Sequence, residues 1–115
     1  MKAKERPLSW SEFERVEMRI GTIVKAEVFE EARKPAYKVE VDFGEFGVKK
    51  TSAQLTAQYS CADLIGKQIV GVINFPPKQI ANIQSEFLLL GAVGQAGAVT
   101  ILQTERPVAN GLRIA

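Results

Sequence analysis

Positions 37 to 43 carry the strictest residue periodicity of the chain. Four apolar side chains alternate there with three charged ones, in the order Tyr37, Lys38, Val39, Glu40, Val41, Asp42 and Phe43. Because successive side chains of a strand point to opposite faces of a sheet, this pattern is typical of a strand with one buried face and one face in water. The chain is therefore expected to build a β-sheet around an apolar interior.

Further strands are expected on both sides of this segment. Met18–Phe29 is a long candidate that also alternates, and the glycine inside it, Gly21, predicts a bulge or sharp coiling. The turn Gly44–Gly47 predicts a hairpin into a third strand, Val48–Gln54. Three apolar runs complete the set, at Ile69–Phe75, Phe87–Leu90 and Val99–Leu102.

Two short helices are predicted. The first begins near Ser9 or Ser11, either of which can cap it, because each has a glutamate three residues on. The second spans Cys61–Ile65 and ends at Gly66. A helix between the third and fourth of five main strands is the order of an OB-fold. We therefore expect an all-β protein, an OB-fold five-stranded Greek-key barrel with a short N-terminal helix and a C-terminal extension, in a single domain over residues 1–115. A β-sandwich is the alternative, which the position of the second helix disfavours.

The composition excludes several classes of chemistry. The chain of 115 residues has no histidine, and Cys61 is its single cysteine. Transition metals prefer imidazole and thiolate ligands, and Ser-His or Cys-His catalysis needs a histidine. The sequence has no phosphate-binding glycine loop and no dinucleotide-binding motif. We therefore predict no catalytic residue, no metal and no cofactor, and a protein that acts by binding.

The sequence gives no indication of a membrane or secretory segment. Hydrophobic residues make up 46% of the chain and charged residues 24%. No apolar run approaches the roughly 20 residues that span a bilayer, and the basic N-terminus is not followed by an apolar run. A cytoplasmic protein without membrane insertion is the expectation.

The segment that follows the apolar run Ile69–Phe75 is a candidate binding surface. Two prolines end the run, and proline fixes its backbone and offers no main-chain donor. A rigid apolar shelf lowers the ordering cost of binding a flexible chain. The candidate peptide-binding residues are Phe75, Pro76, Pro77 and Ile80. The alternative is that Phe75 and Ile80 plug the end of the barrel.

A polar, positive face is predicted beside this segment. Residues 48–81 carry a net charge of +3, whereas residues 26–47 carry −3. Lysine, arginine and glutamine can contact the phosphates and sugars of a nucleic acid. The candidates are Arg19, Lys49, Lys50, Ser52 and Gln54. Alternation places Lys49 and Lys50 on opposite faces of a strand, so at most one points into a given groove. The alternative for each lysine is an ordinary solvated side chain.

Several spaced segments together carry a specific resemblance. They are VEMRIGTIVKAE, VDFGEFGVKKTSAQLTAQYSCADLIGKQIVGVINFPPKQIANIQSEFLLLGA and VANGLRI. These segments resemble the tRNA-binding OB domain that occurs in structure-specific tRNA-binding proteins and as an appendage of some aminoacyl-tRNA synthetases. Within that family, ARKPAYKVEVDFG, the NFPP turn and SEFLLLG are most similar to a branch of small bacterial proteins regarded as export-related chaperones.

The resemblance implies a homodimer in which the N-terminal helix and the C-terminal tail contribute to the contact. The residues expected in that contact are Trp10, Phe13, Leu112 and Ile114. A helix this short is marginal in water unless it packs on something, which favours Trp10 as a contact. The resemblance also implies tRNA binding for the family, and binding of unfolded precursor proteins for the chaperone branch.

The match to the tRNA-binding pattern is incomplete. Asn74, Lys78 and Ser85 carry over as candidate nucleic-acid contacts, but relatives have Ser-Gln-Gly-Met where this chain continues from Ser85 with Glu86. A carboxylate opposes a polyanion, and Phe75 makes the neighbouring turn more apolar. We therefore predict a chaperone that binds unfolded export precursors during protein secretion, with the export machinery as a further partner. The alternative is a protein that recognises the shape and backbone of tRNA.

Overall fold

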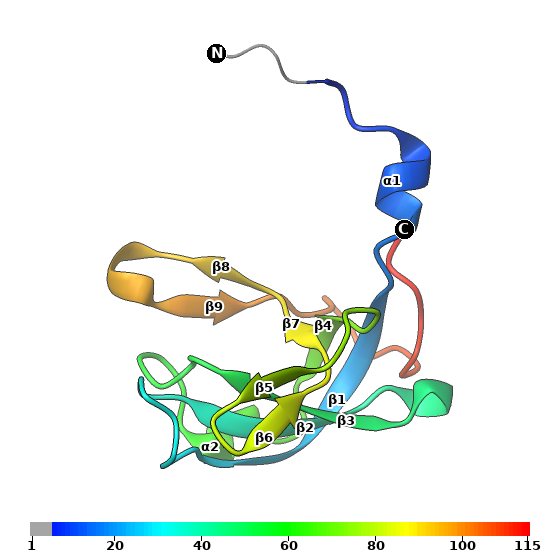
Figure 1. Cartoon of the computed structure of the whole chain (residues 1–115). Coiled ribbons are helices and arrows are strands. Elements are labelled where there is room, and N and C mark those ends of the chain that lie inside the picture. Colours follow the sequence, from blue (N-terminus) through cyan, green and yellow to red (C-terminus); the bar gives the residue numbers. More distant parts are fainter. Residues whose placement is uncertain (1–5) are drawn as a thin grey trace.

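A five-stranded antiparallel sheet forms the body of the protein, as the computed structural model of residues 6–115 describes it (Figure 1). Its strands are β1 Met18–Val28, β2 Tyr37–Asp42, β3 Val48–Ala53, β4 Gln68–Val72 and β7 Leu88–Leu89, in the spatial order β3-β2-β1-β4-β7. The sheet curls until the edge of β3 meets the segment before β7, where the Glu86 N–H donates to the Lys50 carbonyl at 2.8 Å. The result is a nearly closed barrel, which confirms the expected OB-type fold.

Two short ribbons stand outside this sheet. The first pairs β5 Lys78–Ile80 with β6 Ile83–Ser85, and the second pairs β8 Gly91–Val93 with β9 Val99–Ile101. Helical elements are few, namely α1 Trp10–Glu14, α2 Cys61–Leu64, and the 3-10 turns η1 Gly44–Phe46 and η2 Gln95–Gly97. In Figure 1 the β8–β9 ribbon projects from one side of the barrel, while α1 stands beside the C-terminus on the other.

The alternating segment, residues 37–43, contributes one face to the core, as its two-residue period predicts. Its four apolar side chains, Tyr37, Val39, Val41 and Phe43, are buried, while the charged residues between them are half-buried on the outer face. The Phe43 ring meets the Phe87 ring edge to face, with the two centroids 5.0 Å apart. The apolar run Ile69–Val72 in β4 is buried throughout, because neighbouring strands and the core cover it.

Strand β1 departs from the predicted alternation. The pairing with β2 shifts register between Ile23 and Lys25, so the bulge lies at Val24 and not at Gly21. A bulge places two consecutive residues opposite one and inverts the inside-outside order beyond it. Ile23 is therefore fully buried, whereas the Val24 side chain is 48% exposed.

Gly21 is required for close packing. A Cβ atom at that position would lie 2.4 Å from Cγ1 of Val41 and 2.7 Å from the Phe43 ring. No side chain fits there unless these core residues move.

The two predicted helices are present, and each begins with a capping box. Ser9 caps α1 and Ser60 caps α2, because each serine side chain accepts a hydrogen bond from the backbone N–H three residues on. Gly66, at φ +91°, provides the left-handed backbone that follows α2. No residue of α1 is buried, so the helix contributes nothing to the barrel core. Within residues 6–115, no helix is long and apolar enough to cross a membrane.

The C-terminal extension is fastened to the barrel by polar side chains. The Gln68 amide donates to the Val108 carbonyl at 2.7 Å and to Oδ1 of Asn110 at 3.0 Å. The Thr22 hydroxyl also donates to Oδ1 of Asn110, at 2.7 Å. The Asn-Gly turn continues into backbone hydrogen bonds with β1, including that from Ile20 N to the Leu112 carbonyl. The tail therefore closes one side of β1 and β4.

Candidate binding surface

The double-proline turn is exposed at the end of β4. We use "lip" for residues 75–78, which run from the turn after β4 to the first residue of β5. The Phe75 side chain is 56% exposed, and both prolines are exposed as well. The alternative in which Phe75 plugs the barrel is therefore excluded. Ile80, by contrast, is half-buried in the β5–β6 ribbon.

A small apolar pocket lies under the lip. Its volume is about 280 Å³, and it is lined by Phe75, Pro76, Lys78, Ser85, Phe87 and Leu88. Phe87 is buried and forms the floor, whereas the Leu88 side chain is 48% exposed. Leu88 thus lies outside the core although Phe87 next to it lies inside, because successive side chains of an extended segment point in opposite directions. The pocket offers apolar surface with one cation at its rim.

Asn74 joins the lip to the N-terminal helix. Its Nδ2 donates to the Arg15 carbonyl at 2.7 Å, and its Oδ1 accepts from the Glu17 N–H at 3.0 Å. Both polar atoms of the amide are therefore engaged with the backbone between α1 and β1. This contact fixes the start of the lip.

Two other polar candidates also have partners within the chain. The Arg19 guanidinium donates to Glu17 Oε1 at 2.9 Å and to the Gly111 carbonyl at 3.2 Å, and it lies 4.5 Å from the centroid of the Phe46 ring. The hydrogen bond from Arg19 lowers the pKa of the Glu17 carboxyl. The Ser85 hydroxyl is 2.6 Å from the Thr51 hydroxyl.

A second, larger cleft lies at the tip of the β5–β6 ribbon. It has a volume of about 750 Å³, between the β1–β2 loop and the tip of the ribbon, with the end of β3 at its floor. Of the predicted nucleic-acid contacts, Ser52 and Gln54 lie here, and so does Ile80, which was predicted to bind peptide but does not line the lip pocket. Arg33 and Lys34 also line this cleft, and neither was among the predicted site residues. The dibasic pair in the sequence was the available signal, but nothing local indicates that the loop faces β3.

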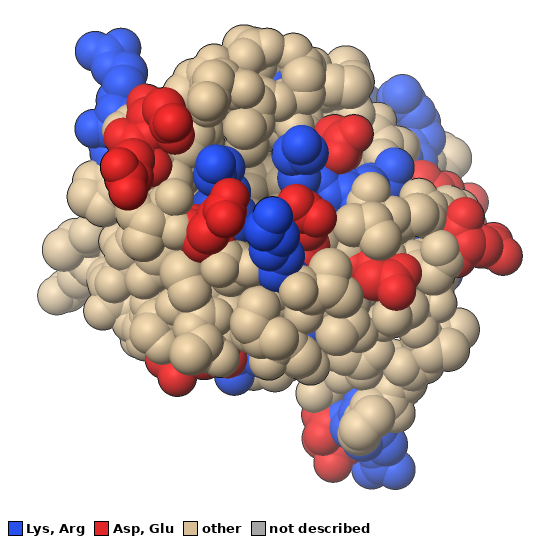
Figure 2. All heavy atoms as spheres, turned by 90° about the horizontal axis from the view of Figure 1, so that it is seen from below, with Lys and Arg blue, Asp and Glu red and all other residues tan. Residues whose placement is uncertain are grey.

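The outer face of β1 to β3 carries charges of both signs. Lys38 pairs with Glu27 across the strands at 3.2 Å, and Lys25 approaches Glu40 at 4.0 Å. The hydrogen bond from Lys38 is the main cause that lowers the pKa of the Glu27 carboxyl. These four residues line a small groove on the outer face. Lys50 lines the same groove and forms no ion pair within residues 6–115. Figure 2 shows basic and acidic side chains interspersed on the face seen from below, so it is not a continuous basic surface.

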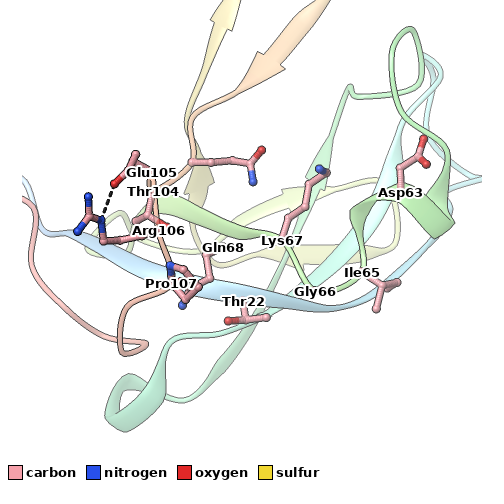
Figure 3. Close-up of a pocket in the computed structure, with 11 residues that line it drawn as sticks. Thr22, Asp63, Ile65, Gly66, Lys67, Gln68, Thr104, Glu105, Arg106 and Pro107 are labelled. Atoms are coloured by element: carbon pink, nitrogen blue, oxygen red, sulfur yellow. Dashed lines mark hydrogen bonds and ion pairs between the residues drawn. The ribbon is translucent and has the colours of Figure 1, made fainter.

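A third cleft, of about 600 Å³, lies at the start of β4, whereas the lip follows the end of that strand (Figure 3). Its cations stand beside carboxylates, because Arg106 pairs with Glu105, and Lys67 is close enough to Asp63 to help lower the pKa of that carboxyl. The main causes of that lowering are the hydrogen bonds from Ser60. Among the residues described, no group of three or more His, Cys, Asp or Glu side chains is arranged to hold a metal ion.

Of the residues expected in a dimer contact, Trp10 and Phe13 lie in or beside the groove under α1, whereas Leu112 and Ile114 lie on the C-terminal tail outside the lining of that groove. Trp10 is 83% exposed, and Leu112 is exposed on the tail. Phe13 and Ile114 are half-buried. Trp10 and Phe13 line a groove of about 420 Å³ with Arg113 and Ala115. The helix is held there by the Arg113 guanidinium, which donates to the Glu14 carbonyl at 2.9 Å.

These features define a small OB-type β-barrel in which the lip pocket and the second cleft both border the β5–β6 ribbon. The family model described as "Putative tRNA binding domain" matches residues 18–113, and the chain belongs to that family.

Solved structures of similar chains narrow the comparison. A crystal structure of the chaperone CsaA from Bacillus anthracis strain Ames has 48% sequence identity and a TM-score of 0.91, and the match covers 96% of this chain and all of that one. The CsaA chaperone from Picrophilus torridus has 41% identity and a TM-score of 0.87, over 95% of this chain and 100% of the other. The chain is thus a CsaA-like member of the tRNA-binding-domain family.

The same domain occurs in synthetases. The methionine–tRNA ligase of Leptospira biflexa is 36% identical over 100 residues, which are 87% of this chain but 14% of the ligase. The chain therefore spans only a small part of the length of the synthetases that it matches.

Proposed function

We propose that this protein is a cytoplasmic chaperone that binds unfolded export precursors, with the lip and its pocket as the peptide-binding site. The observation that carries this proposal is the exposure of Phe75 and Leu88 around an apolar pocket on a rigid proline turn. Large apolar side chains exposed together on a folded protein mark an interaction site. The similarity over the whole chain to structures of CsaA chaperones supports the same function.

The proposed mechanism is reversible capture of apolar side chains. Two prolines hold the lip backbone in place before the client arrives, which reduces the ordering cost of binding. Phe87 gives the pocket a floor that is anchored in the core. Lys78 at the rim keeps the surface charged around the apolar centre. Delivery of the client to the export machinery belongs to the same proposal.

The double variant Phe75→Ser/Leu88→Ser tests the lip. We expect its affinity for a labelled, unfolded precursor peptide to fall by about tenfold or more, because full burial of one such side chain contributes about 1.5–3 kcal/mol and tenfold corresponds to about 1.4 kcal/mol. Fluorescence anisotropy measures the affinity. The matched control is Val93→Ser, which removes an exposed apolar side chain on the β8–β9 ribbon. Equal affinities of the double variant and the unaltered chain would refute the site.

The second candidate function is tRNA binding. It is favoured by the family model, which covers residues 18–113, and by the domain that methionine–tRNA ligases share with this chain. Lys49, Lys50 and Lys78 form no ion pair within residues 6–115, so they are available to phosphates. The glutamates on the outer face reduce the expected affinity. This function does not exclude the first.

We also propose a homodimer through α1 and the C-terminal tail. Size-exclusion chromatography with light scattering at micromolar concentration is expected to give twice the chain mass. The double variant Trp10→Ala/Leu112→Ala should shift the protein towards the monomer, because it removes exposed apolar surface from both α1 and the C-terminal tail. Val93→Ala serves as the control for the loss of an exposed apolar side chain. A monomer mass for the unaltered chain would contradict the dimer.

A further inference from the structure

We propose that the Asn74 side chain couples the two proposed binding events, so that packing of α1 in the dimer strengthens the binding of peptide at the lip. Asn74 acts as a positioning residue, through the helix on one side and the lip on the other. The inference rests on the peptide-binding lip and on the homodimer of the proposed function, and adds a linkage between them.

The helix α1 depends on side chains from outside it. None of its five residues is buried, and a helix this short is marginal in water unless it packs on something. The last carbonyl groups of a helix also have no partner within it. At the end of α1, the Arg15 carbonyl accepts from Nδ2 of Asn74 at 2.7 Å. The Glu14 carbonyl accepts from the Arg113 guanidinium at 2.9 Å. Asn74 and Arg113 therefore hold the end of α1, and with it Trp10, in place.

The other half of the Asn74 amide fixes the start of the lip. Its Oδ1 accepts from the Glu17 N–H at 3.0 Å, and the Ile73 N–H donates to the Glu17 carbonyl at 3.0 Å. Phe75 follows directly, and its backbone is restricted because Pro76 comes next, while the Pro76 ring fixes its own φ. A change in the position of Asn74 is therefore passed on to the Phe75 side chain, which lines the lip pocket.

We use "junction" for residues 14–17, where α1, the lip and the C-terminal tail meet. The Glu17 carboxylate accepts from Arg19 at 2.9 Å and from Arg113, on the tail, at 3.2 Å. In the described part of the chain, the groove under α1 and the lip pocket share no lining residue. The junction is thus the connection between the two sites, and Asn74 contacts it from the side of the lip.

The physical basis of the coupling is the ordering of one helix. A partner protomer that covers Trp10 favours the arrangement in which α1 is docked and Asn74 is engaged. A lip that is already held in place loses less conformational freedom when peptide binds. Linkage between two binding events is reciprocal, so peptide should strengthen the dimer by the same factor per site. Such couplings typically amount to about fivefold or more.

The variant Asn74→Asp separates the two contacts of the amide. Aspartate keeps an oxygen that accepts from the Glu17 N–H, but it replaces the donor to the Arg15 carbonyl by a second acceptor. We expect the affinity for a short labelled precursor peptide, which fills only one lip, to fall about fivefold or more in fluorescence anisotropy. The matched control is Asn82→Asp, the same change at the exposed turn between β5 and β6.

The dimer provides a readout that a purely local role at the lip would leave unchanged. Sedimentation equilibrium should show a dimer about fivefold or more weaker in Asn74→Asp, although Asn74 does not line the groove under α1. In the unaltered chain, saturating peptide should strengthen the dimer about fivefold or more, and Asn74→Asp should abolish this effect.

The dimer variant completes a thermodynamic cycle. Trp10→Ala/Leu112→Ala should lower the peptide affinity about as much as Asn74→Asp does, although neither mutated residue lines the lip pocket. Combining all three changes should lower it no further, because both variants interrupt the same coupling. Asn74 is exposed, so Asn74→Asp is expected to fold, which thermal melting checks.

Distinct outcomes overturn distinct parts of the proposal. An unchanged peptide affinity in Asn74→Asp, or an equal loss in Asn82→Asp, refutes the role of Asn74. A loss of peptide affinity with an unchanged dimer reduces Asn74 to local support of the lip and refutes the coupling. A dimer that peptide does not strengthen refutes the linkage, while both binding events stand. An unaltered chain that binds no peptide, or that stays monomeric, instead removes the part of the proposed function on which the linkage rests.

Discussion

Replacing Phe43 by alanine is expected to lower the free energy of unfolding by about 3–5 kcal/mol, the usual cost of emptying a buried phenylalanine site. The Phe43 side chain is fully buried at the centre of the barrel. Gly21 of β1 and Gly71 of β4 face its ring, and a Cβ on either glycine would lie 2.7 Å from a ring carbon. Few neighbours can close the resulting cavity, because strands on both sides are fixed by pairing. Guanidinium unfolding followed by circular dichroism measures the loss.

The same substitution should also weaken peptide binding at the lip. Phe87 touches Phe43 on its inner side and lines the lip pocket on its outer side, so loss of the first ring loosens the floor of the pocket. Phe43→Leu is the matched control, because it keeps most of the buried volume and should cost clearly less. A Phe43→Ala protein that unfolds at the denaturant midpoint of the unaltered chain would contradict the central role of this ring.

The sheet was predictable because its signal is local. Alternation over residues 37–43 reports which face of β2 is buried, and it does so without knowledge of the neighbouring strands. The turn at Gly44–Gly47 and the cap of α2 are also encoded by a few adjacent residues. The bulge at Val24 was not predictable in this way, because Val24 and Ile23 are both apolar β-formers and the choice between them depends on pairing with β2.

The polar residues of the site were harder to predict for a physical reason. The residue types show that Asn74 and Arg19 are able to bind a ligand. They do not show that other groups of the same chain already form hydrogen bonds with both side chains. Asn74 meets the backbone of Arg15 and Glu17, far away in sequence, and Arg19 meets the Gly111 carbonyl. Long-range contacts of this kind follow from the folded topology. The position of Arg33 in the second cleft depends on the same topology.

Gly21→Ala is expected to destabilise the protein by about 1–3 kcal/mol, which is the typical cost of overpacking a core. The added methyl would overlap Cγ1 of Val41 and the edge of the Phe43 ring. The backbone of Gly21 lies in a paired region of β1, opposite Ile69, so the strand cannot retreat freely. Gly94→Ala is the control, because that glycine is exposed at φ −95° and an added Cβ, 3.3 Å from the Ala98 carbonyl oxygen, requires a shift of only a few tenths of an ångström. Thermal and guanidinium unfolding should both show the difference.

A double-mutant cycle tests whether the added methyl of Gly21→Ala acts through the Phe43 ring. If the methyl acts through the ring, the combination of Gly21→Ala with Phe43→Leu should cost at least about 0.5 kcal/mol less than the sum of the two single changes, as contacting residues do. The smaller leucine leaves room beside β1, although Val41 still limits the relief. Strict additivity would mean that the methyl does not act through the ring, and that the cost comes from Val41 or from the conformation of β1 itself. The coupling thus decides whether β1 and the floor of the lip pocket are held in place by one shared ring.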